Sequence, residues 1–444
     1  MDIHWIPFEG KFIVYRPLKR LAFVANAALL RRIEQRLAGQ FPAPAESDAF
    51  LEQIGFWEPD PAPPELWCPG SQGHRPTTAT LLLTSACNLR CTYCYARGGE
   101  DTSYRMSWPL AQRVIDTAYE NARAFGRDEF GLALHGGGEP TLNWEVLEAA
   151  VRYARAKDMP CHISMASNGV WSQRQQHFIL DHFDGLSISF DGIREVQDTQ
   201  RPRASGRGSF SAVLRTIRAL DGSRLRYGVR LTATPATFER LAEGIELLCS
   251  RTDCQVMQVE PAYSGQRGIY ADPTPEQGAA FVNGFMGAFE IAMRHERTLF
   301  YSGARPWVIA SAFCRAPEEA LVVTPEGDVV TCFETHDRRH SATASFTIGE
   351  ATPEAVRIAP NRVAAFAVAQ EERRSGCRSC FCYWHCGGDC ASRCTATAES
   401  RRGRCDVNRA ISREIIAWYI AAGGGVWRGA PDDQAQALLP GPSD

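Results

Sequence analysis

The sequence has few features of membrane, secreted or nucleic-acid-binding proteins. Along its 444 residues, no apolar run approaches the roughly 20 residues needed to cross a bilayer. The N-terminal segment lacks the charged and apolar pattern of a secretory signal. The net charge is -3, lysine is scarce and the arginines are scattered, so no general basic field points to nucleic acid. We therefore expect a cytoplasmic protein with no membrane or nucleic-acid partner.

Cysteine, in contrast, is abundant. The chain has 16 cysteines, and a reducing cytoplasm disfavours disulfides. Metal ligation or redox chemistry is then the natural use of these thiols. Three cysteines lie close together near residue 90, and seven fall between Cys377 and Cys405. We expect both regions to bind metal.

The middle of the chain, residues 78–300, predicts an α/β fold. Short apolar runs alternate with segments that have apolar residues at helical spacing, and such alternation implies a parallel sheet with right-handed crossovers. Six strand–helix units are too few for a closed eight-fold barrel, so we expect an open partial (β/α)6 barrel. The six runs are ATLLLTSAC, GLALHGGGEP, CHISMASNGV, GLSISFDG, RYGVRLTAT and CQVMQVEP.

Polar residues and a glycine turn follow these runs. In sheets of this kind, ligands bind beyond the carboxyl ends of the strands. These residues share a position at the carboxyl ends of the predicted strands, although they were chosen for their chemistry alone. Their common position supports one shared site. The residues concerned are Cys87, the GGGEP turn, Asn168, Asp191 and Glu260.

Three further regions flank the barrel, since the chain is too long for one small core. Residues 1–77 predict a small α+β region, in which a strand pair precedes a helix capped by Asn26. Residues 301–422 form the cysteine-rich region and end in a helix. The tail, residues 423–444, is rich in Gly, Pro, Asp and Gln, and we expect it to be disordered.

The cysteines of the first group are arranged to hold an iron–sulfur cluster. Cys87, Cys91 and Cys94 follow the first predicted strand with the spacing CxxxCxxC. Three thiolates can bind three irons of a four-iron cluster and leave the fourth iron open. The alternative is a zinc knuckle, although zinc usually takes four protein ligands.

The stretch CNLRCTYCY resembles the signature of the radical S-adenosylmethionine superfamily, and the resemblance extends over residues 80 to about 300. It implies a cluster whose open iron binds S-adenosylmethionine and whose electron cleaves it to a 5'-deoxyadenosyl radical. It also implies a cofactor pocket. Its residues would be Tyr93 beside the cluster, the GGEP residues Gly137, Gly138, Glu139 and Pro140 for the methionine amino group, and Asn168, Ser189, Asp191 and Arg201 around the ribose and carboxylate.

The second cysteine region resembles the extension called SPASM, found in radical enzymes that modify peptides and proteins. Cys314 and Cys332 flank a predicted hairpin with a PEGD turn. The resemblance implies two auxiliary four-iron clusters, one held by Cys377, Cys380, Cys386 and Cys405, the other by Cys314, Cys332 and Cys390. The fourth ligand of the latter is Cys382, Cys394 or an open position. A structural zinc module is the alternative.

Two substrate classes fit this resemblance. One is a ribosomally made precursor peptide, cross-linked through a thioether or carbon–carbon bond. The other is a sulfatase, oxidised to formylglycine. Sulfatase-maturing members carry an Asp base directly after the second hairpin cysteine, whereas here Phe333 takes that place and Glu334, our catalytic candidate, comes next. That departure favours a precursor peptide as the substrate. For either substrate, we expect flavodoxin or ferredoxin to be the electron donor.

The N-terminal region bears on the same choice. Its strand pair and the helix LLRRIEQRL resemble small domains that recognise leader peptides by adding them to a sheet edge. The alternative is a cap over the barrel. A different class also stays open, a non-catalytic iron–sulfur electron-transfer protein, which would need no S-adenosylmethionine pocket.

Overall fold

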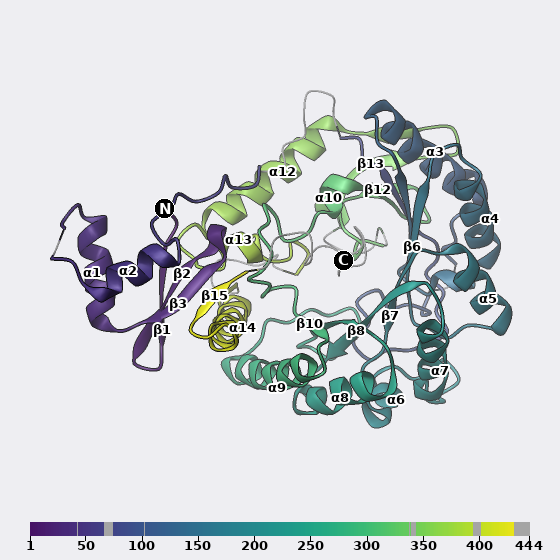
Figure 1. Cartoon of the computed structure of the whole chain (residues 1–444). Coiled ribbons are helices and arrows are strands. Elements are labelled where there is room, and N and C mark those ends of the chain that lie inside the picture. Colours follow the sequence, from purple (N-terminus) through teal and green to yellow (C-terminus); the bar gives the residue numbers. More distant parts are fainter. Residues whose placement is uncertain are drawn as a thin grey trace.

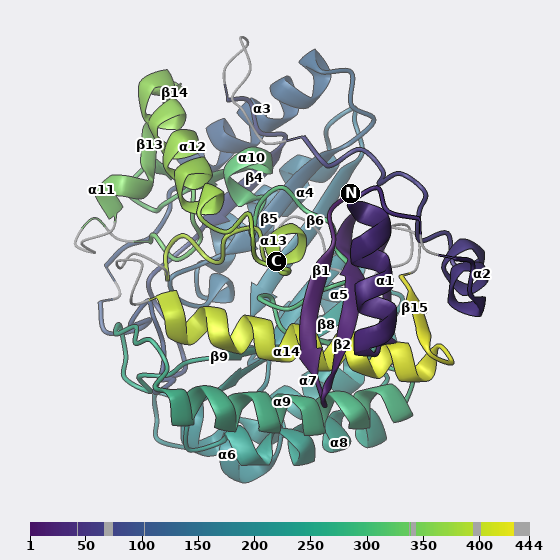
Figure 2. The same cartoon turned by 90° about the vertical axis from the view of Figure 1, so that its left-hand side faces the viewer.

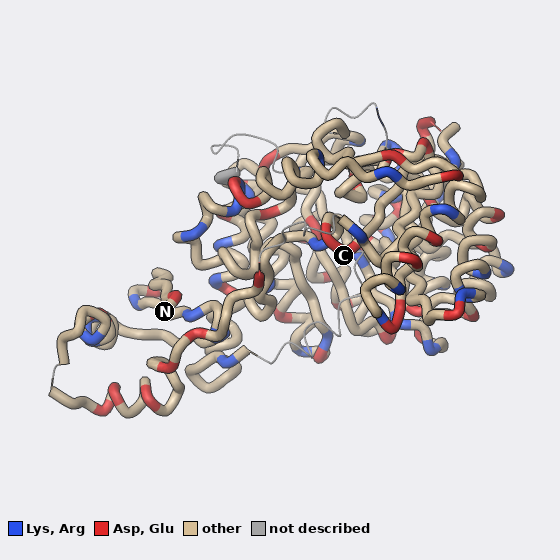
Figure 3. Tube along the Cα trace, turned by 90° about the horizontal axis from the view of Figure 1, so that it is seen from above, with Lys and Arg blue, Asp and Glu red and all other residues tan. Residues whose placement is uncertain are grey.

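The computed structural model describes residues 1–41, 43–65, 74–101, 103–336, 338, 343–393 and 401–429. A curved sheet with helices on its outer side forms the larger part of the molecule, and a small N-terminal sheet stands beside it (Figure 1). Basic and acidic residues are interspersed along the trace (Figure 3). None of the helices in these ranges has the length and apolar character needed to cross a bilayer.

All six predicted barrel strands are present and parallel. A seventh parallel strand, β10 (Thr298–Phe300), extends one edge. β4 and β10 lie far apart in the strand order β10-β9-β8-β7-β6-β5-β4-β11, so the sheet stays open as predicted. The six are β4 (Thr78–Leu82), β5 (Phe130–His135), β6 (Cys161–Ser167), β7 (Gly185–Ser189), β8 (Arg226–Ala233) and β9 (Val256–Pro261).

The helices cover the outer face because their apolar stripes match alternate strand residues. Leu110 and Val114 of α3, for example, belong to the same buried cluster as Leu81 and Leu132. Alternate strand residues therefore face the helices, and those between them face the inside of the curve. The helices are α3 (Trp108–Ala124), α4 (Trp144–Arg155), α5 (Gln173–His182), α6 (Arg194–Gln200), α7 (Phe210–Asp221), α8 (Leu241–Arg251) and α9 (Pro275–Arg294).

The cysteine-rich region continues the barrel sheet. Its hairpin, β11 (Ala320–Val323) and β12 (Asp328–Val330), forms where predicted, and β11 pairs in parallel with β4. The extension is therefore joined to the barrel by backbone hydrogen bonds beside the strand that leads to Cys87. Its other elements are α10 (Ala316–Glu319), α11 (Thr343–Phe346), β13 (Thr347–Ala351), β14 (Val356–Ile358), α12 (Pro360–Ser375) and α13 (Tyr383–Cys386).

The N-terminal region contains the predicted strand pair and helix. These are β2 (Lys11–Arg16), β3 (Leu21–Ala25) and α1 (Ala27–Leu37), and the side chain of Asn26 accepts a hydrogen bond from the backbone N–H of Leu29 (2.9 Å). The structure adds two elements that the sequence does not predict, β1 (His4–Phe8), which pairs with β2, and α2 (Glu46–Gln53).

The C-terminal prediction needs correction. The last helix, α14 (Arg401–Ala422), begins earlier than expected and includes Cys405. The chain then turns, and β15 (Val426–Arg428) pairs with β3 in the N-terminal sheet. Residues 423–429 are thus ordered, whereas residues 430–444 of the predicted tail lie outside the described ranges. Figure 2 shows α14 crossing beside the N-terminal strands.

Trp427 anchors β15. Its ring stacks on Tyr419 of α14 and Tyr15 of β2, with ring centroids 5.7 and 6.0 Å apart. These rings share a buried cluster with Ile416 and Ile420 of α14. The N-terminal strands therefore fold as one layer with α14 and β15.

We expect the substitution Trp427→Ala to lower the free energy of unfolding by about 3–5 kcal/mol, because Trp427 is 5% exposed and truncating a buried aromatic leaves a cavity. Urea unfolding followed by far-ultraviolet circular dichroism measures it. Val368→Ala, at a position 56% exposed, is the control and should change the stability by less than about 0.5 kcal/mol. Equal effects of the two variants would contradict the anchoring role.

Candidate functional site

The loop after β4 holds the three cysteines of the first group. The backbone N–H of Leu89 donates to Cys87 Sγ, and that of Gly98 donates to Cys94 Sγ, both at 3.4 Å. Burial raises the pKa of Cys87 to about 12 and that of Cys91 to about 11. Such thiols ionise when a cationic metal centre compensates the charge. The donor set therefore fits an iron–sulfur cluster.

The GGEP turn interlocks with this loop. The backbone N–H groups of Gly138 and Glu139 donate to the carbonyls of Thr84 and Ala86, each at 2.8 Å. A Cβ added at Gly138 would overlap the carbonyl oxygen of Ala86. Only glycine permits this approach, and it fixes Glu139 next to the cysteine loop.

Glu139 is 2% exposed and held by several donors. Its Oε1 accepts from the hydroxyls of Thr141 and Ser167, both at 2.8 Å, and its Oε2 from the backbone N–H of Asn168 at 2.9 Å. Burial raises its pKa, and these donors oppose that shift. Because Oε2 has a single donor among the described residues, it keeps capacity for a ligand ammonium group.

Asn168 connects the end of β6 to the cysteine loop. Its Nδ2 donates to Asn88 Oδ1 (2.7 Å) and lies 3.8 Å from Cys87 Sγ, while its Oδ1 accepts from the backbone N–H of Val170. The structure thus brings Asn168, Glu139 and Cys87 together. Ser189 is half-buried at the end of β7.

Tyr93, Asp191 and Arg201 form one buried group. The Tyr93 hydroxyl donates to Asp191 Oδ2 (2.7 Å) and accepts from Arg201 Nη1 (2.6 Å). Burial raises the pKa of Asp191, against the effect of Arg201. The Nε of Arg201 is buried and has no hydrogen-bond partner among the described residues, so a donor remains for a carboxylate. Tyr93 therefore positions this arginine, a contact that the sequence does not reveal.

The cysteines of the extension fall into two groups. Burial raises the pKa of Cys314 to about 11 and that of Cys332 above its usual range, and in each case the charge of Cys390 adds to the rise. The three thiols hence lie within electrostatic reach of one another. Their predicted role as ligands of one cluster stays a prediction.

The second group contains Cys377, Cys380, Cys386 and Cys405. Cys380 and Cys405 both raise the pKa of Cys386, after the larger effect of burial. A hydrogen bond with the Cys382 thiol lowers the pKa of Cys380 to about 6. Cys382 accordingly lies with this group, which argues against it as the fourth ligand of the other. Cys394 lies outside the described ranges.

No three His, Cys, Asp or Glu side chains within the described ranges are arranged to hold a single metal ion.

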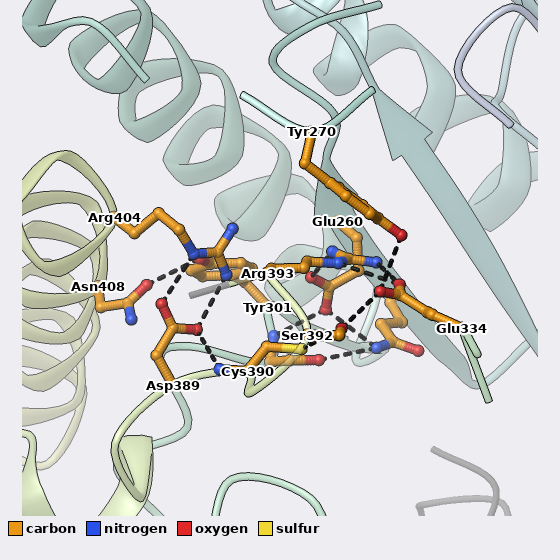
Figure 4. A network of polar contacts seen from close by, with 12 residues as sticks. Glu260, Tyr270, Tyr301, Glu334, Asp389, Cys390, Ser392, Arg393, Arg404 and Asn408 are labelled. Carbon is orange, nitrogen blue, oxygen red and sulfur yellow. Dashed lines mark hydrogen bonds and ion pairs between the residues drawn. The ribbon is translucent and has the colours of Figure 1, made fainter. Parts of the chain in front are cut away.

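Glu334 belongs to a dense polar network (Figure 4). Its Oε1 accepts from Nε and Nη2 of Arg393 at 3.1 and 2.7 Å, and its Oε2 from Ser392 (2.6 Å) and Tyr270 (2.9 Å). Burial alone would raise its pKa, but Arg393 and the hydroxyl donors overcome this and lower it to about 2. A carboxylate this weakly basic is poorly suited to accept a proton.

Arg393 also reaches the barrel. Its Nη1 lies 3.7 Å from Oε2 of Glu260, the buried residue near the end of β9. Glu260 is therefore part of this network, apart from the Glu139 group with which the sequence analysis placed it. Arg393 follows Cys390 by three residues, so it ties the Cys390 segment to both the hairpin and the barrel.

We expect Gly138→Ala to reduce the iron bound at the first cysteine group, because the new methyl group pushes the GGEP turn away from Ala86. Iron and sulfide analysis after anaerobic reconstitution measures it. Gly287→Ala is the matched control, since a Cβ there meets no neighbouring atom. Full iron content in Gly138→Ala would refute the interlocking role.

Glu334→Gln separates an anchoring role from a catalytic one. If Glu334 is an anchor, its loss should leave Arg393 with only the longer ion pair to Glu260, so Glu334→Gln and Arg393→Met should both lower the melting temperature of the apoprotein. If Glu334 instead acts as a base, the Glu334→Gln variant should keep the wild-type stability and lose only product formation. Differential scanning fluorimetry of the two variants distinguishes these outcomes.

Comparison with known proteins agrees with this geometry. Residues 81–249 match the family model described as Radical SAM superfamily. The sporulation killing factor maturation protein SkfB of Bacillus subtilis is 27% identical over 176 residues, which cover 38% of this chain and 39% of that protein. A serine-type anaerobic sulfatase-maturating enzyme of Klebsiella aerogenes is 23% identical over 353 residues, covering 71% and 80%.

A solved structure of native anSMEcpe with bound AdoMet and Kp18Cys peptide has a similar fold. Its TM-score is 0.57 at 16% identity, covering 78% of this chain and 99% of that one. The chain spans 39% to 57% of the length of the first curated relatives that it matches. The match over residues 81–249, the cysteine loop after β4 and the GGEP turn beside it together show that this part of the chain is a radical SAM domain.

Proposed function

We propose that the protein cleaves S-adenosylmethionine reductively and uses the resulting 5'-deoxyadenosyl radical to cross-link a ribosomally made peptide through a thioether or carbon–carbon bond. The observation that carries this proposal is the convergence of the Cys87–Cys94 loop, Glu139 and Asn168 at one edge of the sheet. When bound there, a four-iron cluster would supply the electron that breaks a carbon–sulfur bond of S-adenosylmethionine.

The protein's own residues orient the cofactor. Oε2 of Glu139 accepts a hydrogen bond from the methionine ammonium group. The unpartnered Nε of Arg201 donates to the methionine carboxylate, which an arginine suits because its guanidinium presents several donors in one plane. Asp191 and Tyr93 hold this arginine in place.

The residues after Cys332 favour a peptide over a sulfatase. The place of the expected Asp base is taken by Phe333, whose ring stacks on His135 with centroids 5.4 Å apart. Glu334 is ionised and saturated with donors. Sulfatase maturation is the second candidate, supported by the long match to the serine-type enzyme.

We assign peptide capture to the N-terminal sheet, where an extended leader would add a strand. The edge beside β3 is already filled by β15, which leaves the outer sides of β1 and β15. β1 contains Pro7, which has no N–H to offer. The outer side of β15 borders a groove of about 680 Å³ lined partly by Phe50 and Trp418, and it is the better candidate.

The extension would hold two auxiliary clusters, and flavodoxin or ferredoxin would supply the electrons. With dithionite in place of that donor, the reconstituted protein should convert S-adenosylmethionine to 5'-deoxyadenosine. The Cys87→Ala/Cys91→Ala/Cys94→Ala variant should make none and bind about eight irons where the wild type binds about twelve.

Cys249→Ala is the control for this experiment, because Cys249 is buried in the barrel core and belongs to none of the three cysteine groups. It should keep both the activity and the iron. A wild-type protein that carries its clusters but makes no 5'-deoxyadenosine would support the electron-transfer alternative and refute the enzyme.

The peptide and sulfatase substrates differ in their products. Co-expression with a short peptide encoded beside the gene should give a cross-link between two of its residues, located by tandem mass spectrometry. Formylglycine in a co-expressed sulfatase, together with an unmodified peptide, would favour the second candidate.

A further inference from the structure

Arg374 is a buried cation with no hydrogen-bond or ion-pair partner among the residues that the structure describes. It lies in the last turn of α12, is 3% exposed, and its Nε, Nη1 and Nη2 all lack hydrogen-bond partners. No carboxylate of the described residues lies within ion-pair distance of it. Burying an unpaired charge is costly, so an anion belongs beside this side chain.

Two aromatic rings enclose the guanidinium. It lies 4.2 Å from the ring centroid of Tyr383 and 5.2 Å from that of Trp384. Ring faces attract a cation but leave its five N–H donors without acceptors. Burial lowers the pKa of Arg374, although the positive charge persists at neutral pH because the usual value is so high.

The nearby carboxylates are already engaged. Glu371 is partly exposed and pairs with Arg378 at 3.6 Å. Asp389 forms a two-pronged ion pair with Arg404 at 2.8 and 2.9 Å. The charge of Glu371 acts on Arg374, but neither carboxylate forms an ion pair with it.

A further source of negative charge near Arg374 is the cysteine group Cys377, Cys380, Cys386 and Cys405. The carbonyl of Arg374 accepts from the backbone N–H of Cys377 (2.8 Å), and the charge of Cys377 acts on Arg374. Tyr383 and Trp384 lie between Cys382 and Cys386 in the chain. A four-iron cluster on four thiolates has a net charge of about −2, and net charge is one of the factors that set its potential.

We propose that Arg374 provides the positive charge that offsets a four-iron cluster held by Cys377, Cys380, Cys386 and Cys405, and that it thereby raises the reduction potential of that cluster. Reduction adds one negative charge, which a nearby cation stabilises. Because the site is buried, salt screens this effect little. In this role, Arg374 acts through the positive charge that it places beside the cluster, and it is not a catalytic residue. The proposal rests on the proposed function only for the presence of this cluster.

The experiment uses the full chain with Cys87, Cys91 and Cys94 replaced by Ala, so that only auxiliary clusters are observed. In this background, Arg374→Met removes the charge and keeps most of the side-chain length, and Arg374→Lys keeps the charge. A redox titration followed by electron paramagnetic resonance should show one cluster shifted to a more negative potential in Arg374→Met. Arg374→Lys should restore most of the shift.

Arg378→Met is the matched control. Arg378 lies between Cys377 and Cys380 in the chain but is 71% exposed, so its charge is solvated and its loss should leave both potentials unchanged. An unchanged potential in Arg374→Met with full iron content, or an equal shift in Arg378→Met, would overturn the proposal.

A second measurement, the melting temperature of the cluster-free protein, tests the proposal even if the Arg374→Met variant binds its clusters poorly. In the cluster-free protein, the charge of Arg374 is uncompensated, so Arg374→Met should unfold at the same or a higher temperature than the unsubstituted chain. A lower melting temperature of the cluster-free variant would contradict the proposal.

The outcomes also separate this inference from the proposed function. If the wild type forms 5'-deoxyadenosine but the triple-alanine chain binds no iron, the role of Arg374 is refuted and S-adenosylmethionine cleavage stands. If the wild type forms none while Arg374→Met shifts a potential, the role of Arg374 stands and the proposed reaction fails.

Discussion

The close contact between Gly138 and the carbonyl of Ala86 is the constraint on which the candidate cofactor site depends. Neighbouring strands of a sheet lie about 4.8 Å apart, so the loops that leave β4 and β5 compete for the same space. They share it because Gly138 has no Cβ and because two backbone hydrogen bonds, to Thr84 and Ala86, continue the strand pairing beyond β4. Glu139 is thereby fixed against the cysteine loop, and Asn168 then joins the two from β6.

A second constraint joins the barrel to its extension. β11 pairs with β4, and the charges of Arg393, Glu334 and Glu260 meet where the hairpin, the barrel edge and the Cys390 segment converge (Figure 4). A buried ion pair adds little net stability, but its loss leaves a costly unpaired charge. The network therefore selects one position for the Cys390 segment.

The barrel could be predicted from the sequence because its signals are local. Six apolar runs that alternate with helical patterns identified β4 to β9, and the spacing of Cys87, Cys91 and Cys94 identified the cluster loop. β15 could not be predicted in this way. Val426–Arg428 follows three glycines, and its strand depends on distant partners: it pairs with β3, and Trp427 stacks between Tyr15 and Tyr419.

The roles of individual residues likewise depend on contacts between distant parts of the chain. Glu334 was selected for its position after Cys332, but its basicity is set by Arg393, which lies 59 residues further along the chain. The link from Tyr93 to Arg201 spans 108 residues, and the absence of a partner at Arg374 is visible only in three dimensions. No local pattern encodes such contacts.

The packing of the N-terminal sheet would limit how the proposed peptide substrate reaches the radical. One face of the sheet contacts α1 and α2, the other contacts α14, and β15 extends one edge. α14 also contains Cys405, and Asp2 accepts a hydrogen bond from Trp384, near Cys386, at 2.6 Å. A leader bound to this sheet as proposed would thus be held by the same layer, the N-terminal sheet and α14, that contacts the cysteine group Cys377, Cys380, Cys386 and Cys405. Its distance from the barrel is then fixed, so the length of chain between leader and modified residue would select which residue meets the radical.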